Sequence, residues 1–260
     1  MKIVFHPRMR ESYDSTPAGA PGRLNTAIAS FQNNPDYQLI MPDYAPEEDL
    51  LRAHEQCVLE RAKAEDSSST TKHVYEMAAL AVGGAILTAK LAAMGEPAFG
   101  LIRPPGHHAS ARSYWGFCYF NNMAVALLHL RSKHLIKSAF ILDFDLHVGD
   151  GTIDILGRDK DFHIYNPHAH GDSSYLADVK NALDGCPSVD MIAASAGFDE
   201  YEHCWGHNLS TEAFRKIGQL MNDFAQSQCD GRRFGLLEGG YNHQDLGKNV
   251  LAFCEGLQGR

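Results

Sequence analysis

The sequence predicts an α/β fold: a three-layer α/β/α arrangement around a central, mainly parallel sheet. Short apolar runs bounded by glycine or proline alternate with longer helical patterns, which is typical of parallel sheets. In addition, 44% of the 260 residues are hydrophobic, enough for a substantial core. Because α/β domains often exceed about 200 residues, we expect residues 1–260 to form one domain.

The apolar runs are the expected strands. They are KIVF near the start of the chain, FGLI (99–102), AFIL (139–142), MIAAS (191–195) and FGLLE (234–238). The amino-terminal stretch is too short and too polar for a signal peptide, so we expect the chain to begin in a strand. There is no run of about 18 uninterrupted apolar residues, so we expect no membrane-spanning helix.

Periodic apolar patterns predict the helices. They cover 72–94, 122–133 and 211–228, with a further candidate over 47–63. Ser210 resembles a helix N-cap before the third of these helices. The stretch SSSTT (67–71) is expected to be a loop.

Charge and cysteine content exclude some functions. A net charge of −9 argues against a nucleic-acid-binding surface and weakly favours a cationic substrate. The six cysteines are dispersed without a CxxC pair, which is typical of free thiols in a reducing compartment. We therefore expect a cytoplasmic protein with no direct nucleic-acid or membrane partner.

Four of the expected strands end in polar, glycine-containing turns. FGLI leads into RPPGHH, AFIL into DFDLHVGDG, MIAAS into AGFD, and FGLLE into GGYN. Ligands bind beyond the carboxyl ends of parallel strands, so these turns are expected to form one site. The residues expected to converge are His107, His108, Asp143, Asp145, His147, Asp199 and Tyr241.

The run DFDLHVGDG predicts a metal centre. Alternate residues of a strand share a face, so Asp143, Asp145 and His147 can point the same way. Buried carboxylates need a cationic partner, and oxygen and nitrogen ligands suit Zn²⁺, with Fe²⁺ as second choice. Asp145 and His147 are two plausible ligands. Asp199 is the best-placed third, which would leave a position open for water or substrate.

Two acids and two histidines then remain for acid–base chemistry. Asp143 and Asp150 can each pair with an imidazole of His107 or His108, and such pairing orients the ring and tunes its pKa. Tyr241, between glycine and asparagine at a strand end, can donate its hydroxyl to a developing oxyanion.

Two other features permit different interpretations. The aromatic stretch 114–122 predicts either an apolar tunnel wall or ordinary core packing. Cys118 within it suggests a cysteine amidase that uses His107 or His108, although embedded thiols are usually inert.

The ordered motifs RPPGHHA, GFCYFNNMAVA, LDFDLHVGDGT, SAGFD and EGGYN together resemble the histone deacetylase superfamily, which includes acetylpolyamine amidohydrolases. The resemblance extends over essentially the whole chain and is strongest to short bacterial or class IV-like members. It implies an arginase/deacetylase-like fold with a metal at the carboxyl edge of the sheet. It also implies a single deacetylase catalytic domain, residues 1–260: a zinc-dependent hydrolase that removes an acetyl group from a primary amine such as acetyl-lysine.

The resemblance also implies residue roles. The metal ligands would be Asp145, His147 and Asp199. A structural potassium ion would involve Asp143, Asp145 and His147. Gly116 would line the tunnel that holds an aliphatic chain, as would its neighbour, Phe117.

For catalysis, the resemblance makes His108 the principal general base and acid, paired with Asp150. His107 would be a second, electrostatic histidine paired with Asp143. Tyr241 would polarise the acetyl carbonyl.

The sequence departs from the family pattern in three places. Val148 stands where a second histidine is usual, EYEHCWGH follows SAGFD in place of a segment with Asp-Pro, and FHIYNPHAHGD (162–172) carries a Tyr-Asn variant. Other functions remain open: an amidohydrolase for acetylpolyamines or other small amides, a non-catalytic binder of acetylated ligands, or the cysteine amidase.

Overall fold

The chain is described by a computed structural model over residues 1–66 and 73–260. Its centre is a seven-stranded sheet in which every described pairing is parallel, in the order β2-β1-β3-β7-β6-β4-β5. The strands are β1 (Lys2–Val4), β2 (Gln38–Ile40), β3 (Ala98–Gly100), β4 (Ala139–Asp143), β5 (Phe162–Tyr165), β6 (Ile192–Ala196) and β7 (Arg233–Leu237). All five predicted strands are present, as is the predicted parallel arrangement.

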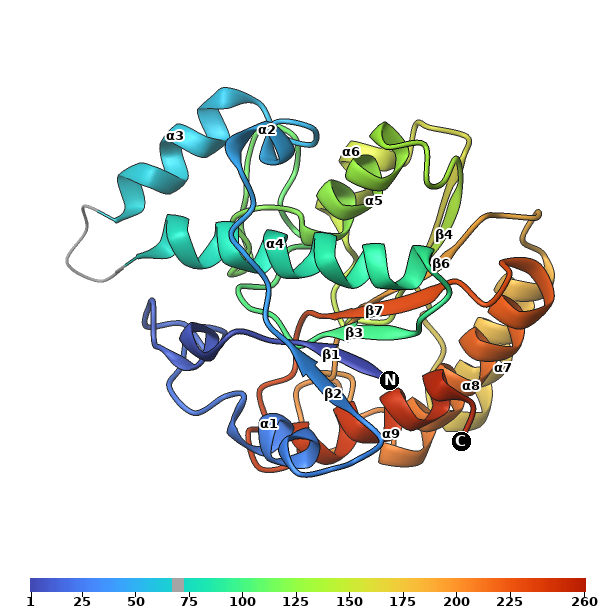
Figure 1. Cartoon of the computed structure of the whole chain (residues 1–260). Helices are drawn as coiled ribbons and strands as arrows, with labels where there is room; N and C mark the ends of the chain where they lie inside the picture. The colour runs from blue at the N-terminus through green and yellow to red at the C-terminus, as the bar shows by residue number, and fades with distance from the viewer. Residues whose placement is uncertain (67–72) are drawn as a thin grey trace.

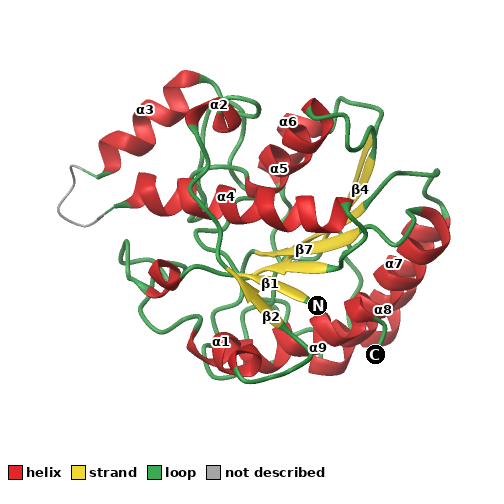
Figure 2. Cartoon of the chain, in the orientation of Figure 1, coloured by secondary structure: helices red, strands yellow, loops and turns green. Residues whose placement is uncertain are grey.

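Helices cover both faces of the sheet (Figures 1 and 2). Helices α2 to α6 lie on one face, and α1 with α7, α8 and α9 lies on the other, which confirms the three-layer prediction. The helices are η1 (Pro7–Arg10), α1 (Asn25–Gln32), α2 (Glu47–Leu50), α3 (Gln56–Glu65), α4 (Val74–Ala93), α5 (Asn122–Ser132), α6 (Asp150–Leu156), α7 (Asp172–Asp184), α8 (Thr211–Gln228) and α9 (Leu246–Gln258).

Helix α4 is the central helix of its layer. Among the described residues it is the one helix long and apolar enough to cross a membrane by length and composition. It packs on β1, β3 and β7, and 72% of its most apolar window is buried within the fold. Burial of its alanine and leucine face against the sheet accounts for this hydropathy, as expected for a core helix.

The four motif-bearing strands are neighbours, which brings their turns together. Strands β3, β7, β6 and β4 are adjacent in the sheet. The register places Gly100, Leu236, Ser195 and Asp143 in one row across them. Each of the four turns begins just beyond this row, at one edge of the sheet, because parallel strands all end on the same side.

Two local predictions were wrong. The segment 47–63 is not one helix: α2 ends at Leu50 and α3 begins at Gln56, because the Glu55 N–H donates to the carbonyl of Ala111 at 2.8 Å. The strand expected to carry three ligands on one face ends at Asp143. In the turn beyond Asp143, main-chain N–H groups donate to side-chain carboxylates instead of to a neighbouring strand.

In that turn the Asp145 N–H donates to a carboxylate oxygen of Asp143 at 3.3 Å, and the His147 N–H donates to Asp145 at 3.0 Å. Edge strands β2 and β5 and helices α1, α6, α7 and α9 were not predicted. By contrast, Ser210 caps α8, accepting from the Ala213 N–H at 3.2 Å. The predicted SSSTT loop lies outside the described residues.

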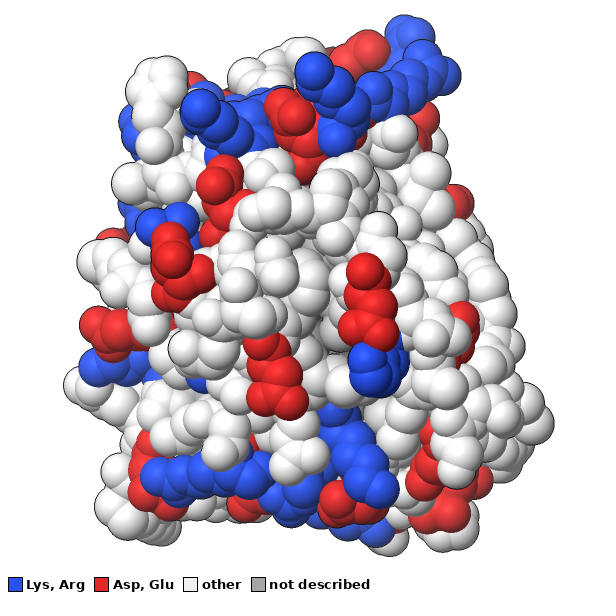
Figure 3. All heavy atoms as spheres, turned by 90° about the vertical axis from the view of Figure 1, so that its right-hand side faces the viewer, with Lys and Arg blue, Asp and Glu red and all other residues white. Residues whose placement is uncertain are grey.

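The face on the right-hand side of Figure 1 carries charges of both signs (Figure 3). Basic groups gather towards the top and bottom of that view, and acidic groups lie beside and between them. An uncharged area occupies much of the middle. This face therefore has no unbroken basic surface of the kind that binds a nucleic-acid backbone.

Candidate active site

Three predicted metal ligands meet at the carboxyl edge of the sheet. Asp145 and His147 come from the turn after β4, and Asp199 comes from the turn after β6. One potential ligand atom from each lies within 4.8 Å of the other two. His147 Nδ1 faces both carboxylates, 3.3 Å from Asp145 Oδ1 and 3.4 Å from Asp199 Oδ2. The arrangement is that of a three-ligand site with one open side.

The charges of this group interact strongly with one another. Burial and the charge of Asp145 raise the pKa of Asp199. Burial opposes ionisation of Asp145 too, but His107, His147 and the Gly239 N–H together hold its pKa below the ordinary value. Contacts with the carboxylates of Asp145 and Asp199 raise the pKa of His147 to about 10.

One carboxylate oxygen of this group is poorly satisfied. Among the described residues, the buried Asp199 Oδ2 accepts no well-formed hydrogen bond and has only the His147 Nδ1 contact at 3.4 Å, which is costly for a carboxylate unless a cation occupies that side. A Cβ at Gly239 would lie 2.5 Å from Asp145 Oδ2 and 2.6 Å from Asp199 Oδ2, so only glycine allows this close approach of the backbone. These residues fit a divalent metal such as Zn²⁺ or Fe²⁺.

The first histidine pair is buried. His107 Nδ1 lies 3.2 Å from Asp143 Oδ2, and its Nε2 lies 3.8 Å from Asp145 Oδ1. Burial opposes the charge on this imidazole, but Asp145 and Asp143 raise its pKa well above the ordinary value. The two carboxylates beside His107 therefore favour its protonated form.

The second histidine pair lies at the pocket. His108 Nδ1 is 2.6 Å from Asp150 Oδ1. Burial and the positive charge of His107 lower the pKa of His108 to about 4. This imidazole is neutral near pH 7, and its bond to Asp150 leaves Nε2 able to accept a proton.

A small pocket of about 120 Å³ opens onto these groups. Most of the predicted site residues line it, and the remaining three, Asp143, Asp150 and Asp199, contact the histidines that line it. The predicted residues that line it are His107, His108, Gly116, Phe117, Asp145, His147 and Tyr241. The convergence expected from the sequence is therefore observed, and the aromatic stretch forms a pocket wall at Phe117 as well as packing in the core.

Three residues around this pocket were not singled out from the sequence, although Trp115 lies within the aromatic stretch 114–122. Trp115 and Trp205 line its mouth, and the Trp205 ring stacks on Tyr241 with centroids 4.1 Å apart. Arg23 is buried beneath Tyr241 and donates from Nε to the Gly240 carbonyl at 3.0 Å. Nothing local in the sequence marks Arg23, because it lies more than 200 positions from its partner.

A further buried acid, Glu238, contacts the loop that carries the two histidines. Glu238 Oε2 accepts from the Gly106 N–H at 2.6 Å and from the His107 N–H at 3.2 Å. Burial raises the pKa of Glu238 to about 7. The strand-end position of this glutamate, directly before GGYN, was the signal that could have identified it.

Cys118 does not have the surroundings of a nucleophile. The thiol is buried, and burial raises its pKa well above the ordinary value, whereas reactive cysteines have a lowered pKa. The six cysteines, all within the described residues, are free thiols as expected.

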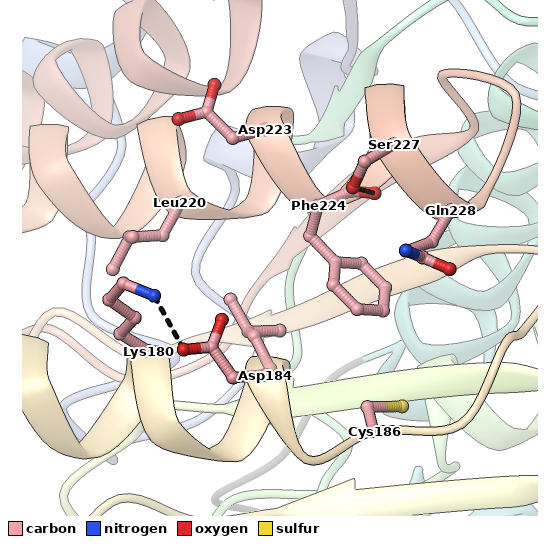
Figure 4. A pocket seen from close by; sticks show the side chains of 9 residues that line it. Lys180, Asp184, Cys186, Leu220, Asp223, Phe224, Ser227 and Gln228 are labelled. Carbon is pink, nitrogen blue, oxygen red and sulfur yellow. Dashed lines mark hydrogen bonds and ion pairs between the residues drawn. The ribbon is translucent and has the colours of Figure 1, made fainter.

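A larger hollow of about 680 Å³ lies elsewhere, between α7 and α8 (Figure 4). Leu220 and Phe224 of α8 face it from one side, and Cys186 faces it from the other. Lys180 pairs with Asp184 on α7. Its lining includes no histidine and no buried carboxylate, so its chemistry is that of a surface groove.

Comparisons with known proteins identify a family and several relatives of this chain. The family model described as "Histone deacetylase domain" matches residues 19–180, more than half of the chain. A "Probable deacetylase" of Methanothermobacter thermautotrophicus is 29% identical over 93% of this chain and 85% of its own length. The "Histone deacetylase-like amidohydrolase" of Pseudomonas aeruginosa is 28% identical over 83% of this chain and 69% of its own length.

A plant relative and a solved structure extend these matches. "Histone deacetylase 14, chloroplastic" of Arabidopsis thaliana is 26% identical over 96% of this chain and 74% of its own length. The crystal structure of the HDA15 HD domain superposes with a TM-score of 0.87, covering 100% of this chain and 89% of that one at 23% identity. That likeness shows a shared fold.

Proposed function

The chain belongs to the histone deacetylase family of deacetylases and amidohydrolases, and from this premise we propose that it hydrolyses the acetyl amide of a primary amine through a zinc-type centre. The proposal rests on one small pocket at which a group of metal ligands and a histidine suited to proton transfer lie together. The Asp145, His147 and Asp199 group lies on one side, and the neutral His108 with Asp150 lies beside it.

The metal would be held by Asp145, His147 and Asp199. The chemistry that a bound zinc ion supplies at such a site is Lewis acidity, which makes an acyl carbon more electrophilic and a water more acidic. Asp143 and Asp150 would orient the two histidines, His107 and His108 respectively.

The proton transfers would run through His108. Its Nε2 accepts a proton as water attacks the acyl carbon, and the same proton is delivered to the nitrogen as the C–N bond breaks. The products are acetate and a free primary amine. His107, whose pKa the neighbouring Asp145 and Asp143 raise, would stabilise negative charge that develops beside it.

Tyr241 would complete the site by donating its hydroxyl to the oxyanion of the tetrahedral intermediate. Burial raises the pKa of this phenol, so it remains a protonated donor throughout the working pH range. Loss of one such donor costs about 3 kcal/mol of transition-state stabilisation.

The substrate would carry a narrow aliphatic stem that fits between the aromatic side chains of the pocket, as acetyl-lysine and acetylated polyamines do. A pocket of about 120 Å³ admits an aliphatic stem with its amide. The net charge of −9 weakly favours cationic substrates in general, and the acetylated polyamine remains the alternative.

A substrate panel tests the proposal. Protein of defined metal content is assayed with acetyl-lysine peptides, acetylpolyamines and longer acyl-lysines, and acetate release is measured. We expect turnover of at least one acetyl amide by the zinc form and none after chelation. Binding without turnover by metal-replete protein would favour a non-catalytic binder. Activity that survives chelation but is lost on thiol alkylation would favour the cysteine amidase.

A further inference from the structure

Trp115 makes two contacts with the His108 and Asp150 pair. Its indole Nε1–H donates to Asp150 Oδ2 at 2.8 Å. Its ring lies over the His108 imidazole, with centroids 4.0 Å apart and planes 32° apart. The side chain is nevertheless 55% exposed, so these contacts, rather than core packing, account for its position.

Asp150 depends on such a partner because it lies at the surface. Half of its side chain is exposed, whereas Asp143, which serves His107, is fully buried. A buried carboxylate is held by its surroundings, but an exposed one can rotate and bind water. Oδ1 of Asp150 accepts from His108 and from the Gly151 N–H, and the indole N–H occupies Oδ2. Hydrogen bonds therefore fix the positions of both carboxylate oxygens of Asp150.

Two rings lie against His108. The His107 ring centroid lies 4.0 Å from that of His108, and the Trp115 ring lies at the same centroid distance. Gly116 closes the edge at a φ of 59°, where an added Cβ would lie 2.4 Å from His108 Cδ2. The imidazole is thus held with Nδ1 towards Asp150.

We propose that Trp115 is a positioning residue, the outer member of a Trp115–Asp150–His108 relay that keeps the His108 proton on Nδ1 and its lone pair on Nε2 towards the pocket. This inference rests on the proposed function, because it assigns His108 the proton transfers described above. Trp115 itself contacts no reacting atom. Its effect reaches the reaction through the carboxylate that it orients and the ring that it covers.

Trp115→Phe is the informative variant. Phenylalanine keeps an aromatic ring over His108 but has no N–H for Asp150. We expect kcat to fall about 10-fold, as for loss of an orienting hydrogen bond to a functional histidine, with KM changed by less than about threefold. Trp205→Phe is the matched control, since it removes the chain's other indole N–H from the same mouth. Phenylalanine keeps a ring against Tyr241, and Trp205 lines the pocket, so this change should act mainly on KM.

A double-mutant cycle tests the route. If Trp115 acts through Asp150, Trp115→Phe should cost little more once Asp150→Asn is present. Equal losses in both backgrounds would overturn the proposal. So would an unchanged kcat, or a change confined to KM, which would make Trp115 a tunnel wall.

A spectroscopic measurement separates this inference from the proposed function. In ¹⁵N-histidine-labelled protein, the Nδ1 proton of His108 should give a low-field signal that Asp150→Asn abolishes. Trp115→Phe should speed its exchange with water, and Trp205→Phe should not. An unaltered exchange rate in Trp115→Phe would refute the positioning role. Absence of hydrolysis by the wild-type protein would refute the proposed function alone, because this signal needs no substrate.

Discussion

The pocket at the sheet edge and the hollow between α7 and α8 differ in a way that volume does not reveal. The hollow is the larger, about 680 Å³ against about 120 Å³. Its one ion pair, Lys180 with Asp184, leaves both side chains about 60% exposed (Figure 4). The small pocket ends on carboxylates that are almost fully buried. Buried charge that requires a counter-ion, rather than open space, therefore distinguishes the site.

The same distinction holds between two histidines with similar pKa values. Burial lowers the pKa of both His54 and His108 to about 4. The ring of His54 is satisfied at both nitrogens by main-chain groups: Nδ1 lies 2.9 Å from the Ser110 carbonyl, and Nε2 accepts from the Asn121 N–H at 2.8 Å. His108 has one nitrogen committed to Asp150 and the other available at the pocket. Geometry, not the pKa, separates the structural histidine from the reactive one.

The largest effect should follow loss of the metal group. We expect Asp199→Asn to bind a divalent ion far more weakly and to lose nearly all turnover, because a neutral amide replaces one of two carboxylates that share the charge. Metal content by elemental analysis and turnover with the best acetyl substrate measure this. Asp223→Asn in the α7–α8 hollow is the matched control and should keep about one ion per chain. Equal metal content in both variants would contradict the assignment.

His108→Ala should lower turnover at least about 100-fold while leaving metal binding intact, because it removes the general base but no ligand. Steady-state kinetics with metal analysis of the same sample measure both quantities. A loss of metal as well as turnover would indicate that His108 supports the ligands rather than the proton transfers. Near wild-type turnover would remove it from the mechanism.

Individual residues show which parts of the fold and the site the sequence could predict. The parallel sheet and the convergence of four turns were predictable, because short apolar runs and strand-end motifs are local patterns. The role of Trp115 was not, since it depends on how the loop before α5 lies over Asp150, the first residue of α6. Arg23 was missed for the same reason: its partners are carbonyls of a distant turn. The break between α2 and α3 depends on a contact with the loop that follows His107 and His108.

A smaller effect should appear in acid, at His54. Its folded pKa of about 4 lies below the ordinary value of 6.5, so between these pH values the unfolded chain binds a proton that the folded chain does not. Stability should therefore be complete above about pH 6.5 and fall by about 3 kcal/mol as pH drops towards 4. Denaturant unfolding of wild type and His54→Gln across this range measures it. The variant should be less stable at pH 7 but have a flatter profile; parallel profiles would contradict the prediction.

The smallest effect should come from the hollow. Lys180 and Asp184 are spaced i, i+4 on α7 and are 2.6 Å apart, but the pair is exposed and the lysine precedes the acid, the weaker orientation against the helix dipole. We expect Lys180→Ala to change the free energy of unfolding by less than about 0.5 kcal/mol, a change that salt reduces further, and to leave turnover unchanged. Denaturant unfolding at low and high salt, together with kinetics, measures this. A loss of turnover would mean that the hollow communicates with the site, and the contrast between the two regions would then fail.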